Sequence, residues 1–182
     1  MKKKMLLSLI CALVLPAANT LAQDTSLYGF FDAGFTRYNE PTADEAAAGF
    51  AAGFGYRMEE SIDFELAYVE YGPADLRSSE TVQGELDTRS FSLAANLGAF
   101  SLGEVVTLQA ILGMEYLRTE KEFIPGNTLV GAPRTDKEND SEALFGLGLT
   151  IEGDSDIAKA RVRLTSNADG DIIRLALGVK VF

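Results

Sequence analysis

Ionisable side chains recur at alternate positions in segments that are otherwise built of apolar and small residues. These residues are Asp32, Arg57, Asp63, Glu65, Glu115, Lys159, Arg161, Arg163, Arg174 and Lys180. Charges that leave bulk water are costly unless they pair with charges of opposite sign. We therefore expect these side chains to share one interior as an ionic cluster. Arg57 and Asp63 flank the same short turn and can pair directly, whereas Arg161 and Arg163 can reach across the interior to Glu65, Asp63 or Asp32.

Residue types that usually perform catalysis are scarce. The chain has no histidine and a single cysteine, Cys11, and it has no Gly-x-Ser-x-Gly motif or phosphate-binding glycine loop. General-base chemistry near neutral pH would need a perturbed carboxylate or lysine instead. The acidic run from Asp136 to Asp140 lacks the alternation and the glycine of a calcium loop. We therefore expect no enzymatic activity, no cofactor and no metal site.

Most of the ionisable residues fall within eight segments that alternate large apolar residues with small or polar ones. A period of two indicates β-strands. The predicted strands span Leu27–Arg37, Gly49–Met58, Ser61–Tyr71, Thr88–Ala99, Val105–Arg118, Ala143–Glu152, Ala158–Asn167 and Asp171–Phe182. Strands of about ten residues match the length that crosses a bilayer at a tilt.

The predicted connections fall into two groups by length. Short turns are expected near Glu59-Glu60, at Ser101–Glu104 and at Gly153–Asp156. Longer, acid-rich loops are expected at Asn39–Ala48, Gly72–Asp87 and Glu120–Glu142, with a shorter one near Ala168–Gly170. Short turns on one side and long loops on the other are the arrangement of outer-membrane barrels, in which the loops face outward.

The first 22 residues differ in kind from the rest. Three lysines, Lys2–Lys4, precede an apolar run from Met5 to Leu15, and small residues end at Ala22. The run is shorter than the roughly 20 residues that a spanning helix needs, so residues 1–22 are predicted to be a cleaved secretory signal. Residues 23–182 are then one domain. Loss of three lysines changes the formal net charge from −11 to −14, which disfavours nucleic acid as a partner.

The composition of the two strand faces distinguishes a membrane barrel from a soluble one. A soluble barrel of the lipocalin type turns its apolar face inward around a ligand, whereas a membrane barrel does the reverse. Here one face carries Gly, Ala, Ser, Thr and the ionisable residues, which suits the narrow interior of an eight-stranded barrel. The other face is almost continuously apolar, and a solvated surface of this kind would aggregate. We therefore favour an all-β, eight-stranded antiparallel transmembrane up-and-down β-barrel over a soluble periplasmic barrel.

Two segments carry a resemblance to a known family. Gly53-Phe54-Gly55-Tyr56 leads through a tight turn into Phe64-Glu65-Leu66-Ala67-Tyr68, and the chain ends in Leu177-Gly178-Val179-Lys180-Val181-Phe182. The sequence thereby resembles the small outer-membrane barrels of the OmpA/OmpX-like superfamily. The resemblance implies the outer membrane of a Gram-negative bacterium, reached through the secretory pathway. It also implies contact with lipid and lipopolysaccharide, and recognition of Gly178 and Phe182 by the barrel-assembly machinery. Phe182 departs from the usual signal because it is out of phase with Val179 and Val181.

These observations leave two functional hypotheses. In the first, the protein is a monomeric, non-enzymatic surface-interaction scaffold with acidic extracellular loops, and the ionic cluster closes the lumen. In the second, it is a narrow pore or porter, gated when the lumenal residues exchange ion-pair partners. The cluster common to both consists of Asp32, Arg57, Asp63, Glu65, Glu115, Arg161, Arg163 and Arg174.

Overall fold

The structure, a computed structural model, describes most of the chain beyond residue 26. The described residues are 27–39, 43, 46–59, 61–78, 81–103, 105–123, 134–152 and 157–182. The predicted secretory signal, residues 1–22, lies outside them. The described part of the chain contains no helix with the length and apolar character that crossing a membrane would require.

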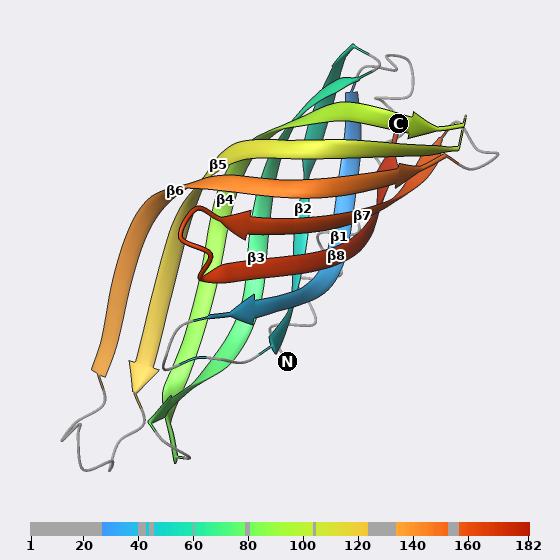
Figure 1. Ribbon diagram of the computed structural model, residues 1–182. Coiled ribbons are helices and arrows are strands. Elements are labelled where there is room, and N and C mark those ends of the chain that lie inside the picture. Colours follow the sequence, from blue (N-terminus) through green and yellow to red (C-terminus); the bar gives the residue numbers. More distant parts are fainter. Residues whose placement is uncertain are drawn as a thin grey trace.

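Eight antiparallel strands form a closed barrel in which each strand pairs with its neighbours in sequence and β1 pairs with β8. The strands are β1 (Leu27–Tyr38), β2 (Ala46–Glu59), β3 (Ile62–Ser78), β4 (Thr81–Leu102), β5 (Val106–Phe123), β6 (Arg134–Ile151), β7 (Ala158–Asn167) and β8 (Ile172–Val181). Figure 1 shows them curving around one lumen. The predicted eight-stranded antiparallel barrel is confirmed.

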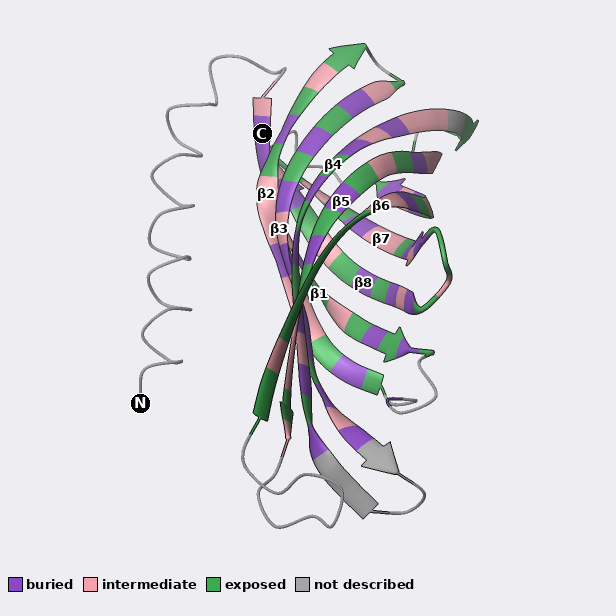
Figure 2. Cartoon of the chain, turned by 90° about the vertical axis from the view of Figure 1, so that its left-hand side faces the viewer, coloured by how far each residue is buried: buried purple, intermediate pink, exposed green. Residues whose placement is uncertain are grey.

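The two faces of the strands differ as the alternation predicted. Outward-facing residues include Phe64, Leu66, Phe91 and Leu147, whose exposed fractions lie between 43% and 61%. Their neighbours in the chain, such as Glu65, are buried in the lumen. Figure 2 shows this as bands of buried and exposed residues that alternate along each strand. The barrel is therefore apolar outside and partly polar inside.

Two predicted loops are strands instead, which corrects the sequence analysis. The segment Gly72–Asp87, expected to be a loop, mostly continues β3 and β4, which pair from Gly72 and Thr88 out to Ser78 and Thr81. Much of the segment Glu120–Glu142 likewise continues β5 and β6, out to Phe123 and Arg134. Charged side chains on the outward face concealed the alternation there, because that face of a projecting hairpin meets water rather than lipid.

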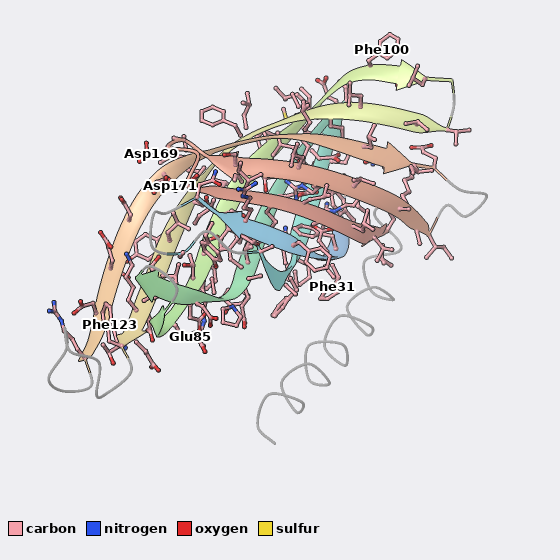
Figure 3. All side chains as sticks on the ribbon, turned by 60° about the horizontal axis from the view of Figure 1, so that its bottom comes forward. Phe31, Glu85, Phe100, Phe123, Asp169 and Asp171 are labelled. Atoms are coloured by element: carbon pink, nitrogen blue, oxygen red, sulfur yellow. The ribbon has the colours of Figure 1, made fainter. Side chains whose placement is uncertain are left out.

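The extended hairpins divide the molecule into two ends. The short-turn end carries the turns after β2, β4 and β6 and the last residue of the chain, and the long-hairpin end carries the tips of β3–β4 and β5–β6. Figure 3 shows Phe100 at the first end and Glu85 and Phe123 near the tips at the second, well beyond Asp169 and Asp171 in the β7–β8 turn. β6 pairs with β7 only from Leu144 onward. The strands β3 to β6 therefore project beyond the closed barrel as one sheet.

Candidate functional site: a closed lumen

The centre of the lumen holds an ionic layer, which we define as Asp32, Asp63, Glu65, Arg161, Arg163 and Lys180. Glu65 accepts hydrogen bonds from Nη1 of Arg161 at 2.6 Å, Nη1 of Arg163 at 2.7 Å and the hydroxyl of Tyr28 at 2.9 Å. The side chains of Glu65 and Arg161 are 1% and 2% exposed. Strands β1, β3, β7 and β8 thus contribute charges that meet across the barrel rather than along one wall.

The other two acids of the ionic layer, Asp32 and Asp63, are also paired with bases. Arg161 binds Asp32 with Nε and Nη2, at 2.6 and 2.5 Å. Lys180 donates to Asp63 at 2.7 Å. Arg57 lies 3.2 Å from Asp63 on the other side of the β2–β3 turn. The structure therefore brings the predicted Arg57–Asp63 pair together, and it gives Asp63 a second partner in Lys180 rather than in Arg161 or Arg163.

Glycines on the intervening strands explain how side chains on non-adjacent strands can contact one another. Gly178 on β8 is level with Asp32 on β1 and with Arg161 on β7. A Cβ atom at Gly178 would lie 2.0 Å from Oδ1 of Asp32. Gly55 on β2 similarly lies between Tyr28 and Glu65. Because neither glycine has a side chain, each pair can meet over the intervening strand.

The remaining predicted members of the cluster, Glu115 and Arg174, lie outside the ionic layer, toward the long-hairpin end. Glu115 accepts hydrogen bonds from the hydroxyls of Tyr71 and of Ser90, the latter at 3.1 Å. It forms no ion pair with the described residues. With Arg163 and Arg174 it lines a small cavity of about 20 Å³. One oxygen of Glu115 and the Nε atoms of both arginines find no hydrogen-bond partner among the described residues.

Beyond this cavity the buried interior of the barrel is apolar. This outer apolar cluster comprises Tyr38, Ala43, Ala47, Ala74, Leu76, Leu86, Leu117 and Ile172, each at most 9% exposed. The residues come from six strands and from the β1–β2 connection. Sequence analysis missed the cluster because Ala74, Leu76 and Leu86 fall in a predicted loop. Their alternation with charged residues is the signal that could have found it.

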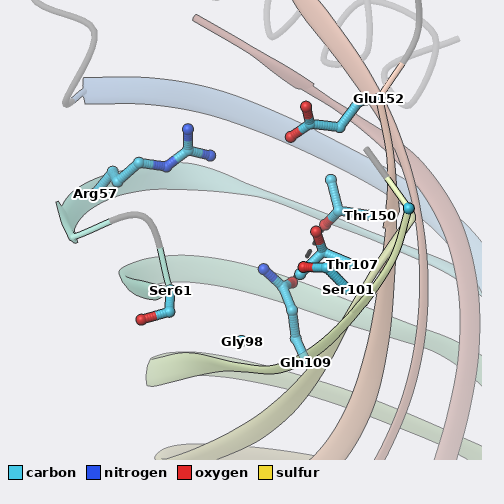
Figure 4. Close-up of a pocket in the computed structure, with 9 residues that line it drawn as sticks. Arg57, Ser61, Gly98, Ser101, Thr107, Gln109, Thr150 and Glu152 are labelled. Carbon is cyan, nitrogen blue, oxygen red and sulfur yellow. Dashed lines mark hydrogen bonds between the residues drawn. The ribbon is translucent and has the colours of Figure 1, made fainter. Parts of the chain in front are cut away.

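The short-turn end opens into a polar vestibule of about 440 Å³. Its walls are Arg57, Ser61, Gly98, Ser101, Gly103, Thr107, Gln109, Thr150 and Glu152, and Figure 4 shows several of these side chains around it. Thr150 donates a hydrogen bond to Gln109 at 3.2 Å. No group of three or more acidic side chains among the described residues is placed to hold a metal ion.

Phe182 contacts the lumenal side of the barrel at this same end. Its ring centroid lies 5.1 Å from that of Tyr28 and 4.7 Å from the guanidinium carbon of Arg57. Lys159, the remaining predicted lumenal base, is 5.4 Å from the same ring and pairs with Glu152 at 2.5 Å. Phe182 therefore shares the inward face of Lys180, as its phase in the sequence indicated.

A comparison with known protein families assigns this barrel. The profile of the OmpA-like transmembrane domain matches residues 22–168. The chain belongs to this family. The predicted resemblance and the location in the outer membrane of a Gram-negative bacterium are thereby confirmed. A comparison with curated proteins found no match.

Solved structures show the same fold. The N-terminal barrel domain of OprF from Pseudomonas aeruginosa is 15% identical, covers 85% of this chain and 96% of its own, and has a TM-score of 0.55. Ail of Yersinia pestis, the attachment invasion locus protein, is 14% identical, and the alignment covers 86% of this chain and 95% of Ail with a TM-score of 0.54. OprG of P. aeruginosa is 9% identical with coverages of 86% and 92% and a TM-score of 0.58.

Membership of the family gives the barrel its direction in the membrane. Outer-membrane barrels place their short turns in the periplasm and their longer connections outside. The vestibule and Phe182 therefore face the periplasm, and the projecting hairpins face the exterior. The apolar outer face of the strands contacts lipid.

Proposed function

We propose that the protein is a non-enzymatic scaffold that presents the projecting sheet at the cell surface while its lumen stays closed. The observation that carries the proposal is the ionic layer. Glu65 meets Arg161, Arg163 and Tyr28 at 2.6 to 2.9 Å, and little space is left for a solute at that level. The outer apolar cluster adds a second closure, because buried apolar side chains exclude water from a narrow passage.

The projecting sheet is the surface that a scaffold of this kind would present. Its described acids include Asp75, Glu85, Asp87, Glu120, Glu122, Asp136, Glu138, Asp140 and Glu142. Loops on a rigid barrel carry recognition in many proteins. The excess of carboxylates supports contact with cationic rather than anionic surfaces, since like charges repel at short range.

We include the biogenesis of the barrel in the proposal. Residues 1–22 act as the cleaved export signal, residues 23–182 form a monomeric barrel domain, and the segment ending in Phe182 is recognised by the barrel-assembly machinery. Gly178 is required at its position for another reason, because a Cβ atom there would collide with Asp32 and with the backbone oxygen of Phe31 at 2.3 Å. Substitution of Phe182 by Ala, with recovery in the outer membrane as readout, tests the assembly role separately from lumen closure.

Conductance across planar bilayers tests the scaffold directly. We expect the folded protein to show no channel events, and we expect Glu65→Gln to show none either, because the outer apolar cluster remains. Persistent single-channel currents in the unmodified protein would contradict the proposal. Heat-modifiable gel mobility confirms that each preparation is folded.

A gated pore is the second candidate, and one observation favours it. Glu115 is buried without an ion pair among the described residues, and it lines the same cavity as Arg163. If Arg163 exchanged Glu65 for Glu115, the ionic layer would lose one of its links. For this candidate, Arg163→Gln should raise the open probability while Arg57→Gln should leave it unchanged. If the current traces of both variants show only the closed state, the exchange of ion-pair partners by Arg163 is excluded.

A further inference from the structure

The outer surface of β4 and β5 carries an ordered ladder of cross-strand pairs that runs from the membrane into the projecting sheet. From the middle of the membrane outward the pairs are Leu93 with Met114, Phe91 with Tyr116, Arg89 with Arg118, and Asp87 with Glu120. The side chains of Leu93, Met114, Phe91 and Tyr116 are between 50% and 64% exposed. The ladder therefore passes from aliphatic to aromatic to cationic to anionic within four rows. Figure 1 shows β4 and β5 side by side along this length.

The arginine row is unusual in its energetics. Like charges directly opposite one another on neighbouring strands destabilise a sheet. Arg89 and Arg118 nevertheless face each other, and their side chains are 49% and 54% exposed. Each has an acid two residues away on its own strand, with Arg89 donating to Asp87 at 2.6 Å and Arg118 to Glu120 at 2.7 Å. A guanidinium carries several N–H donors, so these bonds leave donors on both arginines.

A groove lies directly below the arginines. Its volume is about 330 Å³, and its lining includes Tyr68, Phe91 and Tyr116 together with Arg89 and Arg118. Tyr68 and Phe91 are in contact, with ring centroids 5.4 Å apart. Since this groove is on the outer face of a membrane barrel, a lipid must lie against it. Aromatic side chains at this level are typical of the boundary between hydrocarbon and headgroups.

We propose that this groove is a binding site for a phosphorylated lipid of the outer leaflet, with the phosphate between Arg89 and Arg118. Paired guanidiniums recognise phosphate by charge-assisted hydrogen bonds. The acyl chains follow the aliphatic rows, and the part of the headgroup next to the phosphate lies on the aromatic rings. The phosphate accepts hydrogen bonds from the donors that Asp87 and Glu120 leave free. The site lies outside the barrel, so it is independent of whether the lumen conducts.

Lipid A titrated into the protein folded in detergent tests the site, with binding followed by microscale thermophoresis. We expect Arg89→Gln/Arg118→Gln to weaken the apparent affinity by roughly tenfold or more, because the phosphate loses its contacts with both guanidiniums. The matched control is Arg134→Gln. Arg134 forms the same kind of pair, with Asp136 at 2.7 Å, but it lies near the tip of the β5–β6 hairpin.

The headgroup and the source of the phosphate are tested with two further probes. We expect lipid A freed of its phosphates, and inorganic phosphate alone, each to bind far more weakly than intact lipid A. Equal binding of the dephosphorylated lipid, or equal binding of inorganic phosphate, would overturn the proposal. The proposal would also be overturned if Arg134→Gln lost affinity for lipid A. It would be overturned as well if binding required added Mg²⁺ and persisted in the double variant. If the double variant lacks the folded gel band, Arg89→Gln and Arg118→Gln are measured singly.

Discussion

The ionic layer makes a quantitative prediction for Glu65→Gln. The substitution removes the carboxylate that Arg161 and Arg163 approach at 2.6 and 2.7 Å. Arg161 keeps its two bonds to Asp32, but Arg163 keeps only a long contact with Asp32 at 4.0 Å and a weak hydrogen bond to the neutral Asn96 at 3.4 Å. Breaking a buried ion pair by removing one partner costs about 3–5 kcal/mol, because the other charge stays buried. We expect the free energy of unfolding to fall by an amount near the lower end of that range, since the glutamine oxygen still accepts a hydrogen bond.

Urea unfolding from lipid vesicles, followed by gel mobility without boiling, measures this loss. For a slope of about 2 kcal/mol/M, the midpoint should fall by roughly 1.5 M. The control is Arg57→Gln, which removes a side chain that is 28% exposed and leaves Asp63 paired with Lys180. That change should cost less than about 1 kcal/mol.

A second substitution separates the charge from the shape of the site. Glu65→Gln combined with Arg163→Gln removes the stranded cation together with its partner, so the double variant should be more stable than the sum of the two single losses predicts. If Glu65→Gln unfolds within about 1 kcal/mol of the unmodified protein, the lumenal charges are well hydrated and the reasoning about a dry ionic layer is wrong.

Three further predictions concern other parts of the barrel. Gly178→Ala should lower the free energy of unfolding by about 1–3 kcal/mol, because the added methyl group is overpacked against Asp32. The control Gly29→Ala, where the nearest atom to the added methyl group is 4.0 Å away, should be nearly neutral in the same unfolding assay. Equal losses of stability in the two variants would contradict a steric collision at Gly178. Glu115→Gln should lower the free energy of unfolding by no more than about 1 kcal/mol, because Glu115 forms no ion pair with the described residues. A loss of stability as large as that of Glu65→Gln would contradict this and indicate that Glu115 is ion-paired. On the extracellular hairpin, hydrogen bonds from Arg118 and then Lys137 lower the pKa of Glu120. Its stabilising effect is therefore present above the ordinary carboxyl pKa and is lost as the pH falls through the lowered value; Lys137→Gln should raise this pKa in a carbon NMR titration, and an unchanged value would contradict the assignment.

Much of the fold could be predicted from the sequence because period-two alternation survives wherever one face meets lipid. β7 was predicted with the bounds it has, Ala158–Asn167. The hairpin extensions were not predicted, because beyond the membrane the outward face of a strand carries charges instead of large apolar residues, and the glycine and proline at Gly72-Pro73 suggest a turn. Register shifts after Glu70 and Leu76 show that the strand continues past them with irregularities.

The lumenal site could be predicted in membership but only partly in pairing. The alternation placed Asp32, Glu65 and Arg161 on one face, and the turn placed Arg57 beside Asp63. Which base crosses the lumen to which acid depends on the stagger of the strands and on the glycines between them. Phe30, fully buried with its ring 4.1 Å from the guanidinium carbon of Arg161, was missed because its contact reaches over the intervening strand β8.

The ionic layer and the outer apolar cluster occupy different depths of the same lumen, and they depend on different forces. Under the proposed function, a single substitution that hydrates one of them leaves the other intact, so leakage would require two independent substitutions. A genetic screen for increased permeability in this protein should therefore recover almost no single-residue variants. If the lumen is closed as proposed, substitutions in the extracellular hairpins that disturb the outer apolar cluster would still leave the ionic layer in place.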